Sequence, residues 1–381
     1  MLVLEHTSDW EILRYCQSRN YPTWGQPFTL TDYQEREEIN YKHELCDIMR
    51  DYSKKKKGVY YWIMRDSEAD IERSSNPKFQ NIVSACEILV RDSYFVDASS
   101  NDKTDIQECL SAVIGSVFTF PEYRSRGYAT KMLKLLVDKM KILLGNPYDF
   151  SFLYSEVGEF YSKFGFKSYY EPLCVIQVGS HRTKVSYKYT ELTTDFHAQM
   201  ELYDERLKRL MKKHAQKENK LVVSLKPEQN IIEWFLNRSR FSARALKGFT
   251  DIRTKELVFG AKLDTETNDF IIWFDDFREN TAVVLLLYAD SLENVKKLVD
   301  ICKFHIPNEM NKIIFWETEL YDFDKSGESR NEKEIQTFVK DQLGCETGLE
   351  NGSLSALRML KETVNSQRDT IWEGNGKWAW F

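Results

Sequence analysis

Two arginines and a glycine at a junction between two periodic segments are the residues whose types and spacing most clearly suggest chemistry. Arg124, Arg126 and Gly127 follow an apolar, β-branched run at 112–120 and precede a segment, 129–143, whose apolar residues recur at three-and-four spacing. These patterns predict a strand, a tight turn and a helix. The first amides of a helix lack partners and lie at the positive end of its dipole, so with two guanidinium groups nearby they can bind a phosphate. An ordinary turn is the alternative.

Two motifs, in this order along the chain, resemble the GNAT superfamily of N-acetyltransferases. Arg124-x-x-Gly127-x-Ala129 is similar to its pyrophosphate-binding signature, Q/R-x-x-G-x-G/A, and residues 161–166, Tyr-Ser-Lys-Phe-Gly-Phe, are similar to its Tyr-x-x-x-Gly-Phe element. With an N-terminal Trp-Gly-x-Pro loop and a long C-terminal part, the whole layout is most similar to the fungal L-lysine N6-acetyltransferase family. The resemblance implies transfer of an acetyl group from acetyl-CoA to the side-chain amine of free L-lysine, at the start of lysine catabolism.

Acetyl-CoA is the co-substrate that the resemblance implies, and each part of it has an expected place. The pyrophosphate is expected at the strand-to-helix turn. The pantetheine is expected where strand 112–120 splays from strand 148–154, paired with backbone amides like an added strand. The residues implied in acetyl-CoA binding are Phe118, Thr119, Phe120, Arg124, Ser125, Arg126, Gly127, Tyr128, Ala129 and Thr130.

Tyr161 and Glu87 are the candidate catalytic residues. By the resemblance, Tyr161 would protonate the departing coenzyme A thiolate, because a phenol with an ordinary pKa near 10 stays protonated at pH 7. Glu87 is a carboxylate inside an apolar segment, 82–96. An alkyl ammonium needs roughly 4.6 kcal/mol to lose its proton at pH 7, and a nearby base lowers that cost. The alternatives are an aromatic core position for Tyr161 and a solvated strand face for Glu87.

Three residues are candidates for binding the acceptor amine. Trp24 lies between the first two predicted helices, a region that covers the acceptor site in acetyltransferases of this class, although packing of a loop onto the core is the alternative. Phe381 ends an aromatic-rich tail, 372–381, which we expect to dock beside the cleft. Glu87 is the third candidate, and with Glu35 it provides a carboxylate for an ammonium group.

The chemistry expected from these residues is direct attack of the amine on the thioester in a ternary complex. This route needs no metal, and the sequence has no His-Glu-x-x-His motif or paired Cys/His cluster. Three alternatives remain open at this point. The acceptor is another small amine, the acceptor is a lysine of a protein or peptide, or the chain binds acetyl-CoA without catalysis.

The resemblance to the GNAT superfamily implies an α+β fold in three layers, with a central, mixed and twisted sheet flanked by helices. We expect residues 1–180 to form a GNAT catalytic domain that binds acetyl-CoA. Residues 181–381 resemble a second, partial copy of the acetyltransferase layout without an Arg-x-x-Gly-x-Ala turn, so the resemblance implies a degenerate GNAT-like α+β domain that covers the acceptor site. Residues 21–28 are expected to form an aromatic loop and 167–178 a single strand.

Composition argues against several classes of function. The net charge of −6 disfavours nucleic acid as the main partner. No apolar run has the length of a membrane span, and the N-terminus lacks the basic and long apolar regions of a secretory signal. Seven cysteines without a Cys-x-x-Cys pair are typical of reduced thiols in a cytoplasmic protein. We therefore expect a cytoplasmic enzyme that binds neither membranes nor nucleic acid. The composition does not determine its oligomeric state.

Overall fold

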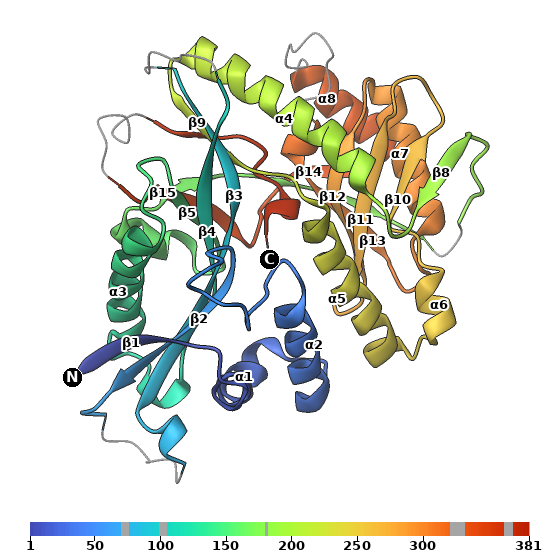
Figure 1. Cartoon of the computed structure of the whole chain (residues 1–381). Coiled ribbons are helices and arrows are strands. Elements are labelled where there is room, and N and C mark those ends of the chain that lie inside the picture. Colours follow the sequence, from blue (N-terminus) through green and yellow to red (C-terminus); the bar gives the residue numbers. More distant parts are fainter. Residues whose placement is uncertain (70–75, 99–104, 180–181, 321–331, 362–368, 381) are drawn as a thin grey trace.

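Two mixed sheets with helices packed against them make up the molecule, which confirms the predicted α+β class (Figure 1). The computed structural model describes residues 1–69, 76–98, 105–179, 182–320, 332–361 and 369–380. In these ranges no helix has both the length and the apolar composition needed to cross a bilayer.

The first sheet is organised around a long antiparallel pair, β3 and β4. Its strand order is β1-β2-β3-β4-β5-β15-β6, β9 pairs with the second half of β3, and β16 pairs with β9. The parallel neighbours are β4 with β5 and β9 with β16. The strands are β1 (Leu2–Thr7), β2 (Gly58–Asp66), β3 (Ile82–Asp97), β4 (Gln107–Thr119), β5 (Phe150–Ser155), β6 (Lys167–Tyr169), β9 (Leu221–Leu225), β15 (Leu354–Met359) and β16 (Ile371–Trp372).

The second sheet repeats part of this plan. Its strand order is β14-β7-β13-β12-β11-β10-β8, and its one parallel pair among the described residues is β12 with β13. The strands are β7 (Leu173–Gln177), β8 (Tyr189–Leu192), β10 (Gly260–Leu263), β11 (Phe270–Asp276), β12 (Thr281–Tyr288), β13 (Lys312–Trp316) and β14 (Cys345–Leu349).

A crossover helix joins two of the parallel pairs, β4 with β5 and β12 with β13. In the first sheet α3 (Tyr128–Leu143) connects β4 to β5, and its three-and-four pattern buries Met132, Leu133 and Leu136 against the sheet. In the second sheet α7 (Leu292–His305) connects β12 to β13. The other α-helices are α1 (Trp10–Trp24), α2 (Leu30–Lys42), α4 (His197–Glu218), α5 (Gln229–Lys247), α6 (Asp251–Lys255) and α8 (Glu332–Phe338).

The strands β4 and β5 separate part-way along their length, as expected. They pair only from Ser111 with Phe150 to Ile114 with Leu153, whereas β4 continues to Thr119. Beyond Ile114, β4 stays paired with β3 on its other edge, across a register shift at Ala85 and Glu87. One edge of β4 therefore lies open, which leaves backbone groups able to pair with an extended ligand.

The predicted loop at 21–28 is wrong in its first half. The helix α1 continues to Trp24 with Pro22 inside it, and the Gly25 N–H closes it on the Tyr21 carbonyl oxygen at 2.7 Å. A proline inside a helix costs about 3 kcal/mol. Burial of the α1 face that carries Leu13 and Cys16 offsets this cost.

The predicted single strand at 167–178 is also wrong, because two strands occupy it. The first, β6, joins the first sheet, and the second, β7, joins the second sheet. Pro172 lies between them and has no N–H to donate to a ladder. Its carbonyl oxygen instead accepts the Glu317 N–H at 2.9 Å, and the chain passes from one sheet to the other.

The two halves of the chain exchange strands. The strands β9, β15 and β16 follow residue 180 in the sequence and complete the first sheet. The strand β7 precedes residue 180 and joins the second sheet. Buried apolar residues of both halves form one continuous core. The division of the chain at residue 180 stays a prediction, and the exchange shows that neither sheet is complete without the other part of the chain.

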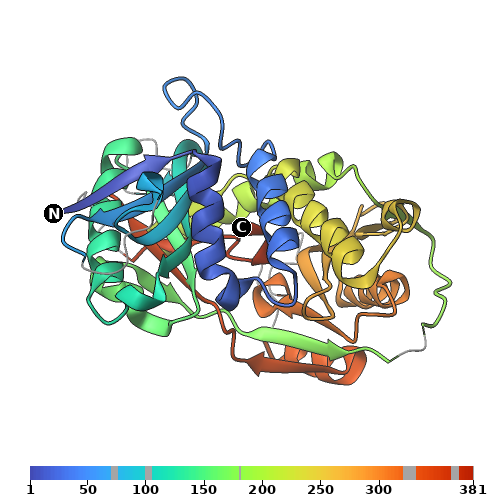
Figure 2. The same ribbon diagram turned by 90° about the horizontal axis from the view of Figure 1, so that it is seen from below.

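The C-terminal tail docks between the two sheets, as expected for its aromatic composition (Figures 1 and 2). Trp378 has no exposed surface, and Trp372 retains 6%. The ring of Trp380 stacks on Tyr154 of β5, with centroids 4.9 Å apart and planes 8° apart. The end of the described chain thus reaches the region where β4 and β5 separate.

Candidate functional site

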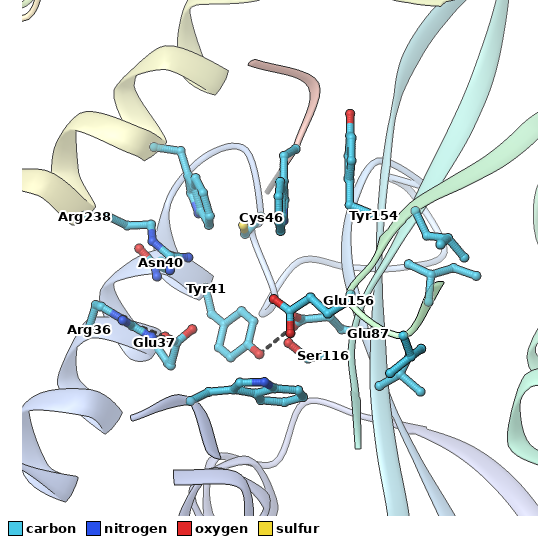
Figure 3. A pocket seen from close by; sticks show the side chains of 18 of the residues that line it. Arg36, Glu37, Asn40, Tyr41, Cys46, Glu87, Ser116, Tyr154, Glu156 and Arg238 are labelled. Atoms are coloured by element: carbon cyan, nitrogen blue, oxygen red, sulfur yellow. Dashed lines mark hydrogen bonds and ion pairs between the residues drawn. The ribbon is translucent and has the colours of Figure 1, made fainter. Parts of the chain in front are cut away.

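A cavity of about 460 Å³ lies where β4 and β5 separate (Figure 3). Its sheet side carries Glu87 of β3 and Ser116 of β4. Helices α2 and α5 form the opposite side, and the tail contributes Trp380. Since α5 and the tail come from the second half of the chain, both halves enclose the cavity.

Glu87 lies on the wall of this cavity and is 6% exposed. Its carboxylate accepts a hydrogen bond from the Tyr41 hydroxyl at 2.6 Å and a second one from the Ser116 hydroxyl. Burial raises the pKa of Glu87 to about 7, although both hydrogen bonds act in the opposite direction. A carboxylate with this pKa can hold or release a proton near neutral pH, as a general base requires.

The local backbone explains how Ser116 reaches Glu87. Ser116 interrupts β4 with a left-handed conformation, φ 51°, next to the register shift between β3 and β4. This irregularity turns the Ser116 hydroxyl toward the Glu87 carboxylate. The same irregularity lies at the point where β4 loses β5 as a partner, so the Glu87 carboxylate lies beside the open edge of β4.

Tyr161 lies on the 3₁₀-helix η3 (Gly158–Phe164), which Gly165 ends in a left-handed conformation, φ 81°, as expected for a cap. Its side chain is 9% exposed and lines the cavity. The phenol makes no hydrogen bond to another described residue. Burial raises the pKa of Tyr161 to about 12, so the phenol stays protonated near neutral pH and can donate a hydrogen bond.

The strand-to-helix turn has the features that an anion site needs. Gly127 precedes α3 with φ 77°, and a methyl group added there would meet no other atom within 4 Å. No side chain caps the first turn of α3, so its amides point outward without a partner from the cap residue. The exposed side chains of Arg124 and Arg126 flank them. A pyrophosphate fits this turn by charge and by space.

The other residues expected at this turn have mixed environments. Ser125 is exposed with φ 61°. The Tyr128 hydroxyl donates to Asp66 at 2.7 Å, so its side chain points away from the turn. Ala129 lines the cavity and connects it to the turn. The hydroxyl of Thr130 accepts a hydrogen bond from Lys163 of η3 at 3.2 Å, which brings a further cation to the first turn of α3.

Phe118, Thr119 and Phe120 lie at the open end of β4. Phe118 and Thr119 pair with Ala85 and Ser84 of β3, and the Phe120 N–H donates to the Val83 carbonyl oxygen at 3.0 Å. The Phe120 amide is therefore engaged on the β3 side. Because amides alternate along a strand, the Thr119 N–H faces the other edge, where a ligand can pair.

The expected acceptor residues separate in the structure. Trp24 lines the cavity, with its ring centroid 5.3 Å from that of Phe118. Glu35, in contrast, is exposed on α2 and does not line the cavity, so the suggestion that it holds an ammonium group is wrong. Two helix positions later, Glu37 lines it instead. Phe381 lies outside the described residues, and its neighbour Trp380 lines the cavity.

Sequence reasoning missed the charged residues on the helix side. Arg36 and Glu37 of α2 and Arg238 of α5 all line the cavity (Figure 3). On α2 they share one face with the aromatic residues Tyr33 and Tyr41, a three-and-four pattern that marks the buried face of this charged helix. Glu156, after β5, and Arg278, after β11, line the cavity too.

Two family models match the chain. The LYC1 GNAT-like C-terminal domain matches residues 178–381, and the Acetyltransferase (GNAT) domain matches residues 105–169. An uncharacterized protein of Saccharomyces cerevisiae is 28% identical in an alignment 433 residues long, gaps included, which covers 100% of this chain and 98% of that protein. A lysine acetyltransferase of Yarrowia lipolytica is 25% identical in an alignment 366 residues long, gaps included, which covers 84% of this chain and 85% of that protein.

Solved structures share the fold at low sequence identity. A GCN5-related N-acetyltransferase from Anabaena variabilis superimposes with a TM-score of 0.54 at 12% identity, over 94% of this chain and 73% of that one. A probable N-acyltransferase from Enterococcus faecalis gives a TM-score of 0.53 at 12% identity, over the same shares of the two chains. Both comparisons extend across the two sheets, so the two-part architecture recurs in these proteins.

Proposed function

This chain belongs to the GNAT acetyltransferases that carry the LYC1 GNAT-like C-terminal domain, and we propose that it acetylates the side-chain amine of free L-lysine. The observation that carries the proposal is the position of Glu87, a carboxylate on the cavity wall at the open edge of β4. The lysine acetyltransferase of Yarrowia lipolytica supports the choice of acceptor.

Acetyl-CoA supplies an acetyl group activated as a thioester. The turn before α3 would hold its pyrophosphate through backbone amides and the side chains of Arg124 and Arg126. The open edge of β4 would orient the pantetheine arm and place its end in the cavity. The lysine amine, held in the same cavity, would attack the thioester directly in a ternary complex, which gains its rate from proximity and orientation.

Glu87 would take a proton from the lysine ammonium group. Its raised pKa makes it a stronger base than an ordinary glutamate by about 3 kcal/mol. Proton transfer from an alkyl ammonium with an ordinary pKa near 10.4 to Glu87 is therefore uphill by roughly 4.6 kcal/mol, against roughly 8 kcal/mol for transfer to an ordinary glutamate. Tyr41 and Ser116 hold the carboxylate in place with their hydroxyl groups.

Tyr161 would donate its phenol proton toward the departing sulfur. With a pKa of about 12, full transfer to a thiolate whose ordinary pKa is about 8.5 is uphill by roughly 5 kcal/mol. A hydrogen bond from the phenol to the sulfur requires no such transfer and still stabilises the developing negative charge. We therefore expect Tyr161→Phe to lower kcat and to leave the affinity for acetyl-CoA nearly unchanged.

The experiment that tests this function measures thiol release from acetyl-CoA with L-lysine, L-ornithine, spermidine and a lysine-bearing peptide in parallel. We expect turnover with free lysine and no more than background with the peptide, because α5 and the tail enclose the cavity. Mass spectrometry of the product identifies the acetylated nitrogen. Turnover with the peptide alone would reject a free amino acid as the acceptor.

A further inference from the structure

The helix side of the cavity is rich in guanidinium groups. Arg36, Arg238 and Arg278 line it, and Figure 3 shows the carboxylate of Glu37 on the same side as Arg36 and Arg238. The other two lining carboxylates, Glu87 and Glu156, lie on the sheet side. The cavity thus has a cationic end opposite the proposed base, and an acceptor that spans it should carry negative charge at its far end.

Two of the three arginines already have partners. Arg36 donates two hydrogen bonds to Glu37, one of them from Nε at 2.7 Å, and packs against the rings of Phe28 and Tyr33. Arg278 donates from Nε to the Gln26 carbonyl oxygen at 3.3 Å. These contacts fix the positions of both guanidinium groups.

Arg238 differs from them. It makes no hydrogen bond and no direct ion pair within the described part of the chain, and its guanidinium group lies 4.5 Å from the ring centroid of Trp234. Figure 3 shows it extending from α5 toward Asn40 and the cavity interior. Burial and the nearby positive charge of Arg36 lower the pKa of Arg238 to about 10. A partly buried cation in this position is stabilised by an anion that enters the cavity.

We infer that Arg238 binds the α-carboxylate of an α-amino acid acceptor. Arg36 and Arg278 supply supporting positive charge, and Glu37 faces the α-ammonium group. The forked guanidinium group matches a carboxylate with two parallel hydrogen bonds, which gives direction as well as charge. The acceptor then extends from α5 toward the sheet and presents its terminal amine to Glu87. This inference rests on the proposed function for the identity of the reacting amine, and it makes Arg238 the residue that selects amino acids over simple amines.

The first arm of the test compares acceptors that differ only in the carboxylate. Initial rates are measured with L-lysine, with L-lysinamide and with cadaverine, the diamine that lacks the carboxylate. The wild type should have a kcat/KM for lysine at least about tenfold above that for cadaverine, since a charge-assisted bidentate pair contributes at least this much. Arg238→Gln should lower kcat/KM for lysine about 10- to 100-fold and change that for cadaverine less than about threefold.

The matched control is Arg244→Gln. Arg244 lies further along the same helix, outside the cavity, with its guanidinium group 3.8 Å from Asp251. This variant should leave all three acceptors unaffected. Calorimetry with acetyl-CoA alone verifies that Arg238→Gln still folds and binds the co-substrate. An equal loss of activity toward lysine and cadaverine in Arg238→Gln would overturn the inference.

The second arm does not depend on turnover. L-Norleucine has the α-carboxylate and α-ammonium groups of lysine but no side-chain amine, so it can occupy the cavity without reacting. Calorimetry should detect its binding to the wild type and to Arg244→Gln, and at least a tenfold weaker binding to Arg238→Gln. If no amine is acetylated but norleucine binds in this pattern, the proposed function fails and the carboxylate site stands. If norleucine does not bind to the wild type, or binds equally to all three proteins, the carboxylate site fails, whatever the turnover.

Discussion

The two strand–helix–strand units of this molecule share a topology and differ in the backbone groups that they leave unpaired. In the first sheet, β4, α3 and β5 form a strand–helix–strand unit, and in the second sheet β12, α7 and β13 form another. The helix α3 begins at a left-handed glycine with no side-chain cap. The helix α7 begins at Ser291, whose hydroxyl accepts the Asn294 N–H at 3.2 Å.

Charge separates the two turns further. Arginines at 124 and 126 flank the turn before α3, whereas Glu293 lies in the first turn of α7. Asp269 also accepts hydrogen bonds there, from the Asp290 N–H at 3.2 Å and from the Asn294 side chain at 2.5 Å. A phosphate would meet free amides and cations at α3, but an occupied amide and carboxylates at α7.

The unpaired strand edge next to each parallel pair, on β4 in the first sheet and on β12 in the second, differs in the same way. The edge of β4 beyond Ile114 is open, but in the second sheet the Leu287 N–H of β12 donates to Glu319, a buried carboxylate, at 3.1 Å. The tail segment η6 (Lys377–Ala379) packs against β12. In the second sheet the tail therefore packs against the edge of β12. The next residue of the tail, Trp380, lines the cavity beside the first sheet. Topology alone does not make a cofactor site; the first helical turn and the strand edge decide it.

The largest effect is expected from removing Glu87, the proposed base on the sheet side of the cavity. Glu87→Gln should lower kcat about 10²- to 10⁴-fold, the range for a general base, and leave acetyl-CoA binding intact. In the wild type, kcat/KM should rise with pH through about 7 as Glu87 loses its proton, and the variant should lack this limb. Steady-state rates with lysine from pH 5.5 to 8.5 measure both effects. A wild-type profile retained in the variant would reject Glu87 as the base.

We expect the same variant, Glu87→Gln, to lose activity but to gain stability above neutral pH. Because the folded-state pKa of Glu87, about 7, lies above its ordinary value of 4.5, the protonated carboxyl group favours the folded state. This contribution is complete below about pH 4.5 and is lost as the pH rises through about 7. Glu87→Gln should therefore unfold at a higher temperature than the wild type at pH 8 and at a similar temperature at pH 4.5. Scanning calorimetry at the two pH values measures the difference.

The next largest effect tests the open turn against a matched glycine. Gly127→Glu should weaken acetyl-CoA binding about 10- to 100-fold, since a carboxylate enters the space of the pyrophosphate and its charge opposes the phosphates. Gly248, after α5, is the control, because it has φ 65° and open space like Gly127. Gly248→Glu carries the same backbone strain and should leave the calorimetric Kd unchanged. Equal weakening in both variants would show that strain, not position, causes the effect.

A smaller effect is expected where the tail meets the cavity. Trp380→Ala removes the stack on Tyr154, a contact of about 0.5–1.5 kcal/mol, and opens one wall of the cavity where the acceptor is proposed to bind. The KM for lysine should rise about 2- to 10-fold, and the Kd for acetyl-CoA should stay the same. Weaker acetyl-CoA binding with an unchanged KM for lysine would place the tail on the co-substrate instead.

The smallest effect belongs to the closed turn of the second sheet. Ser291→Ala removes the cap of α7 and should destabilise the protein by about 1 kcal/mol, as loss of a helix cap typically does. Urea unfolding measures this change. The acetyl-CoA stoichiometry should remain one per chain, because Glu293 and Asp269 still oppose a phosphate there. If this variant bound a second acetyl-CoA, the inference that the turn before α3 favours a phosphate and the turn before α7 does not would be contradicted.

The sequence alone determined the elements that depend on neighbouring residues. The strand, turn and helix around Gly127, the left-handed cap at Gly165 and the aromatic docking of the tail follow from local periodicity, backbone freedom and apolar content. Glu87 stood out as a carboxylate in an apolar strand for the same reason. The α+β class that the resemblance implied is confirmed by the two mixed sheets and their helices.

Only the tertiary structure decided which distant residues share the cavity. Arg238 and Trp380 reach it because β9, β15 and β16 carry the second half of the chain into the first sheet, an exchange that no local pattern encodes. Arg36 and Glu37 look like the wet face of a charged helix until α5 packs against α2. The raised pKa of Glu87 has the same origin, since it comes from burial beneath groups far away in the sequence. The local sequence determines the helices and strands, and long-range packing determines which charged residues meet in the cavity between them.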